Sequence, residues 1–174
     1  GTFVYNGDEP LLRERAKDLK QGQKTFGRQL DNDIYATSVE QSDHDLHFKV
    51  NLWPDEEFTI PMVGEYNVNN AMAAMMVGHL LHVTPSHLKI GLANVELTEN
   101  RAEWLTGQQG EKILSDVYNS NPTAVKEVLE TLNELPETGR RLIVLGDMLE
   151  LGDASAKLHA GLATEIDHQH FQKV

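Results

Sequence analysis

The sequence predicts an α/β fold in which strands alternate with helices. Apolar runs at residues 112–114 and 142–145 read as buried strands, and each is followed by a polar, turn-rich segment. Between them, the segment after Pro122 repeats apolar residues with a helical period, and a second helical segment follows at residues 155–167. Strand, helix, strand and helix in this order imply a parallel sheet with right-handed crossovers.

Length, charge and composition narrow the classes of protein to consider. The 174 residues suffice for one full domain or two partial ones. No apolar run approaches the ~18 residues of a membrane helix. The net charge of −12 argues against a nucleic-acid binder, because that affinity comes largely from Lys and Arg. The charge does not exclude a nucleotide ligand, because backbone N–H groups can bind its phosphates. We therefore expect no nucleic-acid and no membrane partner.

Cysteine usage and the first residues bear on the compartment. The sequence has no cysteine, so it has no disulfide framework and no thiolate zinc site. The chain opens without a basic, apolar leader, so nothing indicates export. These observations predict a cytoplasmic protein.

The first block of the chain, residues 1–98, combines strand signals with three helices. A turn-rich segment at residues 6–10 leads into a helix that extends to about residue 19, and we interpret this turn as structural. The predicted strands cover residues 2–5, 24–26, 34–39, 46–50 and 58–62, and the middle three alternate like exposed antiparallel strands.

Two further helices close this block. Residues 68–81 are apolar nearly all round, which predicts a buried helix. Thr84 is the natural N-cap of the next helix, with Pro85 at its first position. The sequence turns polar at residues 98–101, where we place a domain boundary.

The second block, residues 99–174, contains the alternating elements. A strand at residues 104–105 is expected to pair with one at 112–117 across a glycine-bounded turn. Asn121 is the natural cap of the helix that follows. A strand is expected at residues 141–145, and a new one could begin within 170–174. Both ends of the chain look cut.

Asp116 and the residues after it could bind a ligand. Beyond the carboxyl end of a strand, an Asp can accept hydrogen bonds from sugar hydroxyls, or it can simply form the turn that ends the strand. The residues alone do not separate these readings. Tyr118 could stack on a base or pack under the loop, and Asn119 is the better amide ligand because Asn121 is explained as a cap.

Three other segments carry polar groups that could bind a ligand. Asn67 and Asn70 stand at a helix start, where capping is the ordinary role. Arg101 follows the predicted boundary, where an exposed Arg is usually solvated. Asp147 and Glu150 could form a carboxylate pair for a metal or an amine, or they could cap a helix and face water.

These segments resemble motifs of the Mur ligase family. The string YNSNP ending at Pro122 follows a strand Asp, LGDMLELG at residues 145–152 has a His downstream, and residues 64–70 match a Gly-x-His-Asn-x-x-Asn pattern. LGDMLELG is similar to the branch of the family that adds D-alanyl-D-alanine. Ser120 and Tyr66 depart from the family's Ala and His, and the second change leaves the role of that imidazole open.

The resemblance implies a fold and a set of site residues. Residues 1–98 would be the tail of a P-loop-type ATPase central domain, and residues 99–174 a truncated Rossmann-like C-terminal domain. The resemblance assigns ATP to Asn67, Asn70, Arg101, Asp116, Tyr118 and Asn119, with Arg101 at the phosphates in a catalytic role. It assigns the substrate cleft to Asn121, Asp147, Glu150 and His159.

The resemblance also implies an activity. ATP, with Mg²⁺, would phosphorylate the terminal carboxylate of UDP-MurNAc-tripeptide, and the amine of D-alanyl-D-alanine would attack the acyl phosphate. The enzyme would be a monomer. The sequence contains no Gly-Lys dipeptide, so the phosphate-binding loop and the magnesium ligands are expected upstream, and this chain alone should be inactive. Two alternatives remain: a folylpolyglutamate synthetase-like ligase, and a non-catalytic nucleotide-binding module.

Overall fold

A computed structural model describes residues 1–96, 101–135, 139–166 and 171–173 of the chain. The chain divides into two compact units, residues 1–96 and 97–174, and each is described by itself. Most of the predicted boundary at residues 98–101 lies outside the described residues.

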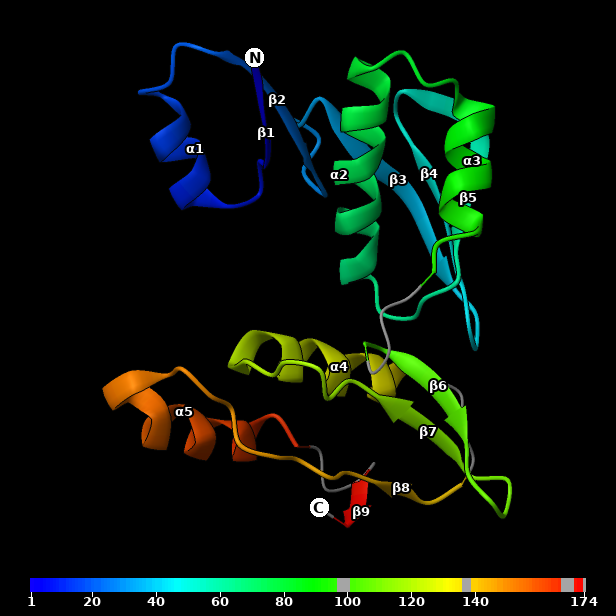
Figure 1. The fold of residues 1–174 in the computed structure, drawn as a ribbon, viewed down its shortest axis with the longest axis vertical. Coiled ribbons are helices and arrows are strands. Elements are labelled where there is room, and N and C mark those ends of the chain that lie inside the picture. Colours follow the sequence, from blue (N-terminus) through cyan, green and yellow to red (C-terminus); the bar gives the residue numbers. More distant parts are fainter. Residues whose placement is uncertain (97–100, 136–138, 167–170, 174) are drawn as a thin grey trace. The chain divides into compact units, whose positions relative to one another are not determined.

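Unit 1 is built on a five-stranded sheet in which the strands follow one another in chain order (Figure 1). The strands are β1 (Thr2–Asn6), β2 (Gly22–Gly27), β3 (Ile34–Gln41), β4 (Leu46–Val50) and β5 (Trp53–Ile60). β1, β2 and β3 are parallel, whereas β3, β4 and β5 are antiparallel. The expectation that residues 24–26 form an antiparallel strand is therefore wrong. Helix α1 (Pro10–Ala16) lies between β1 and β2 in the chain and supplies the crossover that parallel strands require.

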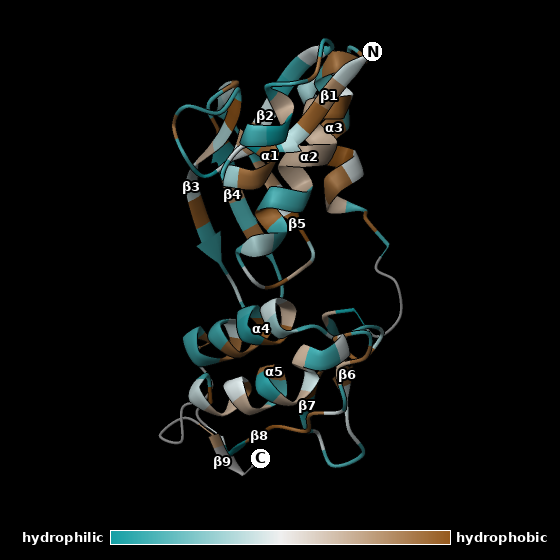
Figure 2. Cartoon of the chain, turned by 90° about the vertical axis from the view of Figure 1, so that its left-hand side faces the viewer, coloured by the Kyte–Doolittle hydropathy of each residue, from teal (hydrophilic) through white to brown (hydrophobic). Residues whose placement is uncertain are grey.

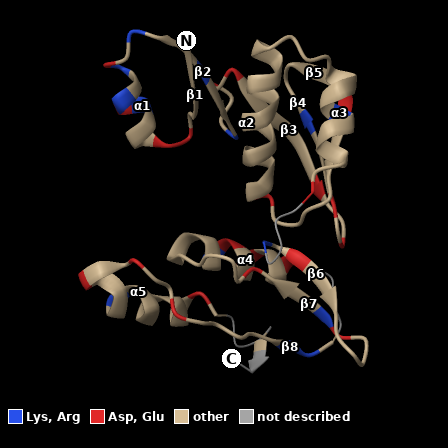
Figure 3. Ribbon diagram, in the orientation of Figure 1, with Lys and Arg blue, Asp and Glu red and all other residues tan. Residues whose placement is uncertain are grey.

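The core of unit 1 lies between this sheet and helices α2 (Tyr66–Leu80) and α3 (Pro85–Ala93). Fully buried core side chains include Ile34, Leu46, Phe48, Phe58, Met72 and Met75. Figure 3 shows that α2 carries no charged residue. Its burial is nevertheless one-sided, because Ala74 is exposed and Val77 is 46 % exposed. The prediction of a buried helix is confirmed for the face that packs in the core, and apolar residues on the outer face extend the pattern beyond it.

The turn after β1 is held by one carboxylate. Asp8 accepts hydrogen bonds from the backbone N–H groups of Arg28 at 2.5 Å and Gln29 at 3.2 Å. It also accepts one from the side-chain amide of Asn32 at 2.8 Å. Three donors on one carboxylate tie the β1–α1 turn to the end of β2, which confirms the structural interpretation of this turn.

Replacement of Gly27 by alanine is expected to destabilise unit 1. A Cβ at this position would lie 2.4 Å from the Asp8 carboxylate, so the carboxylate would have to move away from its donors. We expect a loss of about 2 kcal/mol in the free energy of unfolding, measured by urea denaturation. Gly91 is the matched control: a Cβ there meets nothing within 4 Å in α3, and Gly91→Ala should stabilise the helix by up to ~1 kcal/mol. Equal effects of the two changes would contradict this account.

A second carboxylate joins β2 to the start of β3. Lys24 Nζ lies 2.5 Å from Asp33 Oδ1, and the Thr25 backbone N–H donates to Oδ2 at 2.9 Å. Burial acts to raise the pKa of Asp33, but the hydrogen bonds from Lys24 and Thr25 outweigh it and hold the pKa below its ordinary value.

The lowered pKa of Asp33 predicts an acid-sensitive contribution to stability. A carboxyl whose pKa is lower in the folded state stabilises the fold above its unfolded pKa of about 4, and this contribution is lost as the pH falls through the folded value. The urea midpoint of Asp33→Asn should therefore fall less steeply than that of the wild type below about pH 4. Parallel curves for the two proteins would contradict the prediction.

Unit 2 begins with a hairpin. β6 (Glu103–Thr106) pairs antiparallel with β7 (Lys112–Ser115), as predicted. Helix α4 (Pro122–Glu134) follows, and Asn121 caps it by accepting the Ala124 N–H at 2.9 Å, which confirms the predicted cap. The remaining elements are β8 (Arg141–Leu142), α5 (Ser155–Gly161) with a 3₁₀ turn on either side, and β9 (Phe171–Lys173), which runs parallel to β8.

The strand expected at residues 141–145 is shorter than predicted. Of the residues at 141–145, only Arg141 and Leu142 pair with another strand among the described residues, and Val144 is 93 % exposed. A small core of Leu129, Ile143 and Phe171 lies beneath α4. Figure 2 shows that α4 is hydrophilic along one side and hydrophobic along the other, in agreement with its predicted period. The Arg141 guanidinium donates to the carbonyls of Leu132 and Leu135 at 2.5 Å, which satisfies the C-terminal end of α4.

Candidate functional site

Asp116 links the two ends of the hairpin in unit 2. It follows β7 directly, and its Oδ1 accepts the backbone N–H of Ala102 at 3.0 Å. Ala102 is buried and has a φ of 46°, in the left-handed region that alanine rarely adopts. The carboxylate therefore stabilises a strained residue next to Arg101. A carboxylate offers about four acceptor sites, so Asp116 keeps capacity for further donors.

Arg101 and Tyr118 meet beside this contact. The Arg101 guanidinium carbon lies 4.3 Å from the centre of the Tyr118 ring, a cation–π distance. The stacking orients the planar guanidinium. Because both side chains are exposed, the N–H donors of the guanidinium stay accessible. Three predicted ATP residues, Arg101, Asp116 and Tyr118, are thus brought to one end of the β6–β7 hairpin.

The asparagines of the same loop divide into two roles. The Oδ1 of Asn121 is used by the helix cap. Asn119 is exposed just before it. Asn119 is therefore the better placed of the two for a ligand, and the substrate role predicted for Asn121 stays a prediction.

Asn67 and Asn70 form a pair at the start of α2 in unit 1. Asn67 is 3 % exposed and donates from Nδ2 to the Val63 carbonyl at 2.8 Å. Asn70 is exposed and donates from Nδ2 to Asn67 Oδ1 at 3.2 Å. Asn67 thus fixes the helix start, and Asn70 is the member of the pair that a ligand can reach. Tyr66, where the family pattern has His, is the first residue of α2.

A second cluster of polar side chains in unit 2 lies on the segment after β8 and on α5. His159 Nε2 lies 2.9 Å from the Met148 backbone nitrogen and 3.9 Å from Asp147 Oδ1. The Asp147 side chain is 92 % exposed, and Glu150 is also exposed, with a φ of 61°. A hollow of about 500 Å³ opens beside these residues, lined by Leu145, Gly146, Asp147, His159, Leu162, Ala163 and Ile166.

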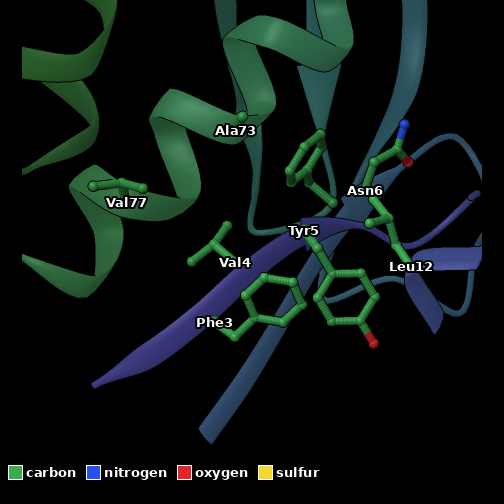
Figure 4. Close-up of a pocket in the computed structure, with 8 residues that line it drawn as sticks. Phe3, Val4, Tyr5, Asn6, Leu12, Ala73 and Val77 are labelled. Carbon is green, nitrogen blue, oxygen red and sulfur yellow. The ribbon is translucent and has the colours of Figure 1, made fainter. Parts of the chain in front are cut away.

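A shallow groove in unit 1 differs in character. Figure 4 shows Phe3, Val4 and Tyr5 of β1 lying opposite Ala73 and Val77 of α2. The Phe3 and Tyr5 rings are stacked, with centroids 4.9 Å apart. The lining is almost wholly apolar, and without convergent polar groups it offers nothing to orient a substrate. We do not assign chemistry to this groove.

The described part of the chain contains no group of three or more His, Asp or Glu side chains that could hold a metal ion. It also contains no helix of the length and hydrophobicity that a membrane crossing requires.

Two features of the site escaped the sequence analysis. The left-handed conformation of Ala102 has no sequence signal, because such positions are normally predicted from Gly or Asn. The hydrogen bond between His159 and the Ser155 carbonyl did have a sequence signal. Ser155 and His159 are four residues apart in a helix, which places the ring near that carbonyl.

Comparison with known proteins assigns the chain to one family. The Mur ligase middle domain matches residues 1–78, and the Mur ligase glutamate ligase domain matches residues 100–174. UDP-N-acetylmuramoyl-tripeptide--D-alanyl-D-alanine ligase of Bacillus subtilis is 34 % identical over 174 residues, which are 100 % of this chain and 37 % of that protein.

Solved structures give the same result for the fold. MurF from Acinetobacter baumannii superposes with a TM-score of 0.80 and 27 % identity, over 93 % of this chain and 35 % of that one. MurF ligase from Thermotoga maritima in complex with ADP superposes with a TM-score of 0.79 and 23 % identity, over 95 % and 38 %. The chain therefore spans little more than a third of the length of these relatives. The chain belongs to the Mur ligase family and contains parts of its middle and C-terminal domains.

Proposed function

We propose that the full-length protein, of which this chain is a part, is an ATP-dependent ligase of peptidoglycan synthesis. It joins D-alanyl-D-alanine to UDP-MurNAc-tripeptide through an acyl phosphate. The 34 % identity to the Bacillus subtilis ligase over the whole chain carries this proposal. The LGDMLELG segment, exposed beside a hollow in unit 2, supports the choice of D-alanyl-D-alanine as the amine.

The residues at the end of the β6–β7 hairpin suit a nucleotide. The half-buried Asp116 carboxylate has acceptor capacity left after binding the Ala102 N–H, as a ribose hydroxyl requires. The Arg101 guanidinium is exposed and oriented by Tyr118, as a phosphate contact requires. ATP would supply the phosphoryl group that turns a carboxylate into an acyl donor. In our proposal Arg101 stabilises the negative charge of the phosphoryl group, and Asp116 orients the nucleoside.

Asn119 completes the proposed nucleotide contacts of unit 2 through an exposed amide, and Asn70 of unit 1 stays a separate predicted contact. The proposal places the magnesium ligands in the remainder of the full-length protein. It includes no nucleic-acid partner, in keeping with the net charge of −12, and it places the enzyme in the cytoplasm as a monomer.

The amine that the full-length enzyme accepts tests the proposal. With UDP-MurNAc-tripeptide and ATP, phosphate release should depend on D-alanyl-D-alanine and should be accompanied by equimolar pentapeptide product. Glutamate with a folate acceptor is the control and should give no turnover. Turnover with glutamate alone would indicate a folylpolyglutamate synthetase-like ligase, and the absence of turnover with either amine would indicate a binding module.

A further inference from the structure

Both ring nitrogens of His159 are engaged by backbone groups whose roles are fixed. Nδ1 lies 2.8 Å from the Ser155 carbonyl oxygen, which can only accept, and 3.3 Å from the Ser155 hydroxyl, which can donate or accept, so the carbonyl contact assigns the proton to Nδ1. Nε2 lies 2.9 Å from the Met148 backbone N–H, which can only donate, so Nε2 must be unprotonated. The two contacts together specify the neutral Nδ1–H tautomer.

A proton on Nε2 does not suit this arrangement. It would point at the N–H of Met148, and that hydrogen bond would be lost. The Asp147 carboxylate lies 3.9 Å from Nε2 and is almost fully exposed, so this contact is weak and solvated. His159 is therefore occupied as a neutral hydrogen-bonding bridge, which leaves neither nitrogen for a substrate.

The hydrogen bond to His159 holds the segment after β8 at Met148. The Met148 side chain is 3 % exposed, whereas Asp147 before it and Leu149 after it are exposed. Two residues with positive φ follow, Glu150 at 61° and Gly152 at 55°. The segment is thus anchored at one buried residue and turns sharply beyond it. The hydrogen bond from Met148 to His159 sets the backbone that carries Asp147 into the lining of the hollow.

We infer that His159 is a positioning residue that holds the Asp147 carboxylate for the amine substrate. The inference rests on the proposed function for the identity of that substrate. The substrate is a dipeptide with a free amino group, and a carboxylate would bind its ammonium form. It differs from the sequence-based expectation, which placed His159 itself against the substrate. The geometry gives that contact to Asp147 and gives His159 the role of fixing its backbone.

The tautomer of His159 is the first test, and it needs no activity. Long-range ¹⁵N–¹H correlation spectra of the 174-residue chain at neutral pH should show protonated Nδ1 and unprotonated Nε2 for this histidine. The Met148 amide should exchange more slowly in the wild type than in His159→Leu. A protonated Nε2, or equal exchange of the Met148 amide in both proteins, would overturn the inference.

Steady-state kinetics of the full-length enzyme give the second test. His159→Leu should raise the KM for D-alanyl-D-alanine about tenfold and leave the KM for ATP unchanged, as expected for the loss of one hydrogen bond that positions the carboxylate. His159→Gln should recover most of the loss, because the Gln amide oxygen reaches the position of Nε2 and can accept the Met148 N–H. Lys157→Gln, an exposed change on the same helix, is the matched control and should have no effect.

A double-variant cycle separates positioning from general structural support. In an Asp147→Asn background, His159→Leu should add little to the KM for the dipeptide, because the group that it positions is already gone. Additive effects would overturn the inference, as would equal rises in the KM for ATP and for the dipeptide. If the wild-type enzyme does not use D-alanyl-D-alanine, the proposed function fails, and the tautomer and exchange data still decide whether His159 holds Met148.

Discussion

Replacement of Arg101 by alanine in the full-length enzyme is expected to lower kcat about 100-fold. In our proposal the guanidinium stabilises charge on the phosphates of ATP, and the loss of one such preorganised donor typically costs two to three orders of magnitude. Tyr118 holds the guanidinium at 4.3 Å, and the Asp116 contact to Ala102 fixes the adjoining backbone. The effect should appear in single-turnover phosphate release.

Three further variants separate the charge of Arg101 from its orientation. Arg101→Lys keeps the charge but loses the planar stacking on Tyr118, so it should recover only part of the rate. Tyr118→Phe keeps the aromatic face and should be nearly neutral, whereas Tyr118→Ala should lower kcat by a smaller factor than Arg101→Ala. Arg140→Ala, an exposed change in the same unit, is the control. An Arg101→Ala enzyme with the wild-type kcat would contradict the assignment.

Replacement of Phe58 by alanine is expected to destabilise unit 1 by about 4 kcal/mol. Phe58 is fully buried, and its ring centroid lies 5.9 Å from those of both Phe48 and Trp53. The substitution removes a large side chain from the centre of the core and loses two aromatic contacts. A loss of this size is a large share of the ~5–15 kcal/mol by which domains are stable.

The two tryptophans allow this effect to be assigned to one unit. Trp53 belongs to unit 1 and Trp104 to unit 2, so each serves as the fluorescent probe of its own unit when the other is replaced by Phe. Phe58→Ala should lower the urea midpoint reported by Trp53. Leu30→Ala, at a side chain that is 77 % exposed, is the control and should change little. A Trp53 midpoint that stays at the wild-type value would show that the core is not organised around Phe58.

Local signals predicted the elements of this fold better than their pairing. Thr84 and Asn121 stand before prolines at helix starts, and both prove to be caps. The hairpin of β6 and β7 follows from apolar runs on either side of a glycine-rich turn. The parallel arrangement of β1, β2 and β3 was missed because alternation of side chains reports burial on one face and carries no information about strand direction.

Long-range contacts account for what the sequence left open at the candidate site. The residues themselves were identified from motifs, yet the stacking of Arg101 on Tyr118 and the bond from Ala102 to Asp116 depend on how the hairpin closes. Val144 was expected in a buried strand because it lies in an apolar run. A strand needs a partner, however, and of the predicted strand at residues 141–145 only Arg141 and Leu142 have one within the described residues. Burial of a run depends on neighbours that its own residues do not specify.

A crystal structure of the full-length enzyme with a non-hydrolysable ATP analogue tests the central claim most directly. The distance to measure joins the Asp116 carboxylate to the ribose hydroxyls. We predict about 2.7 Å, an ordinary O–H···O hydrogen bond, with Asp116 still accepting the Ala102 N–H. A nucleoside bound elsewhere, with its ribose well beyond hydrogen-bonding distance of Asp116, would contradict the account.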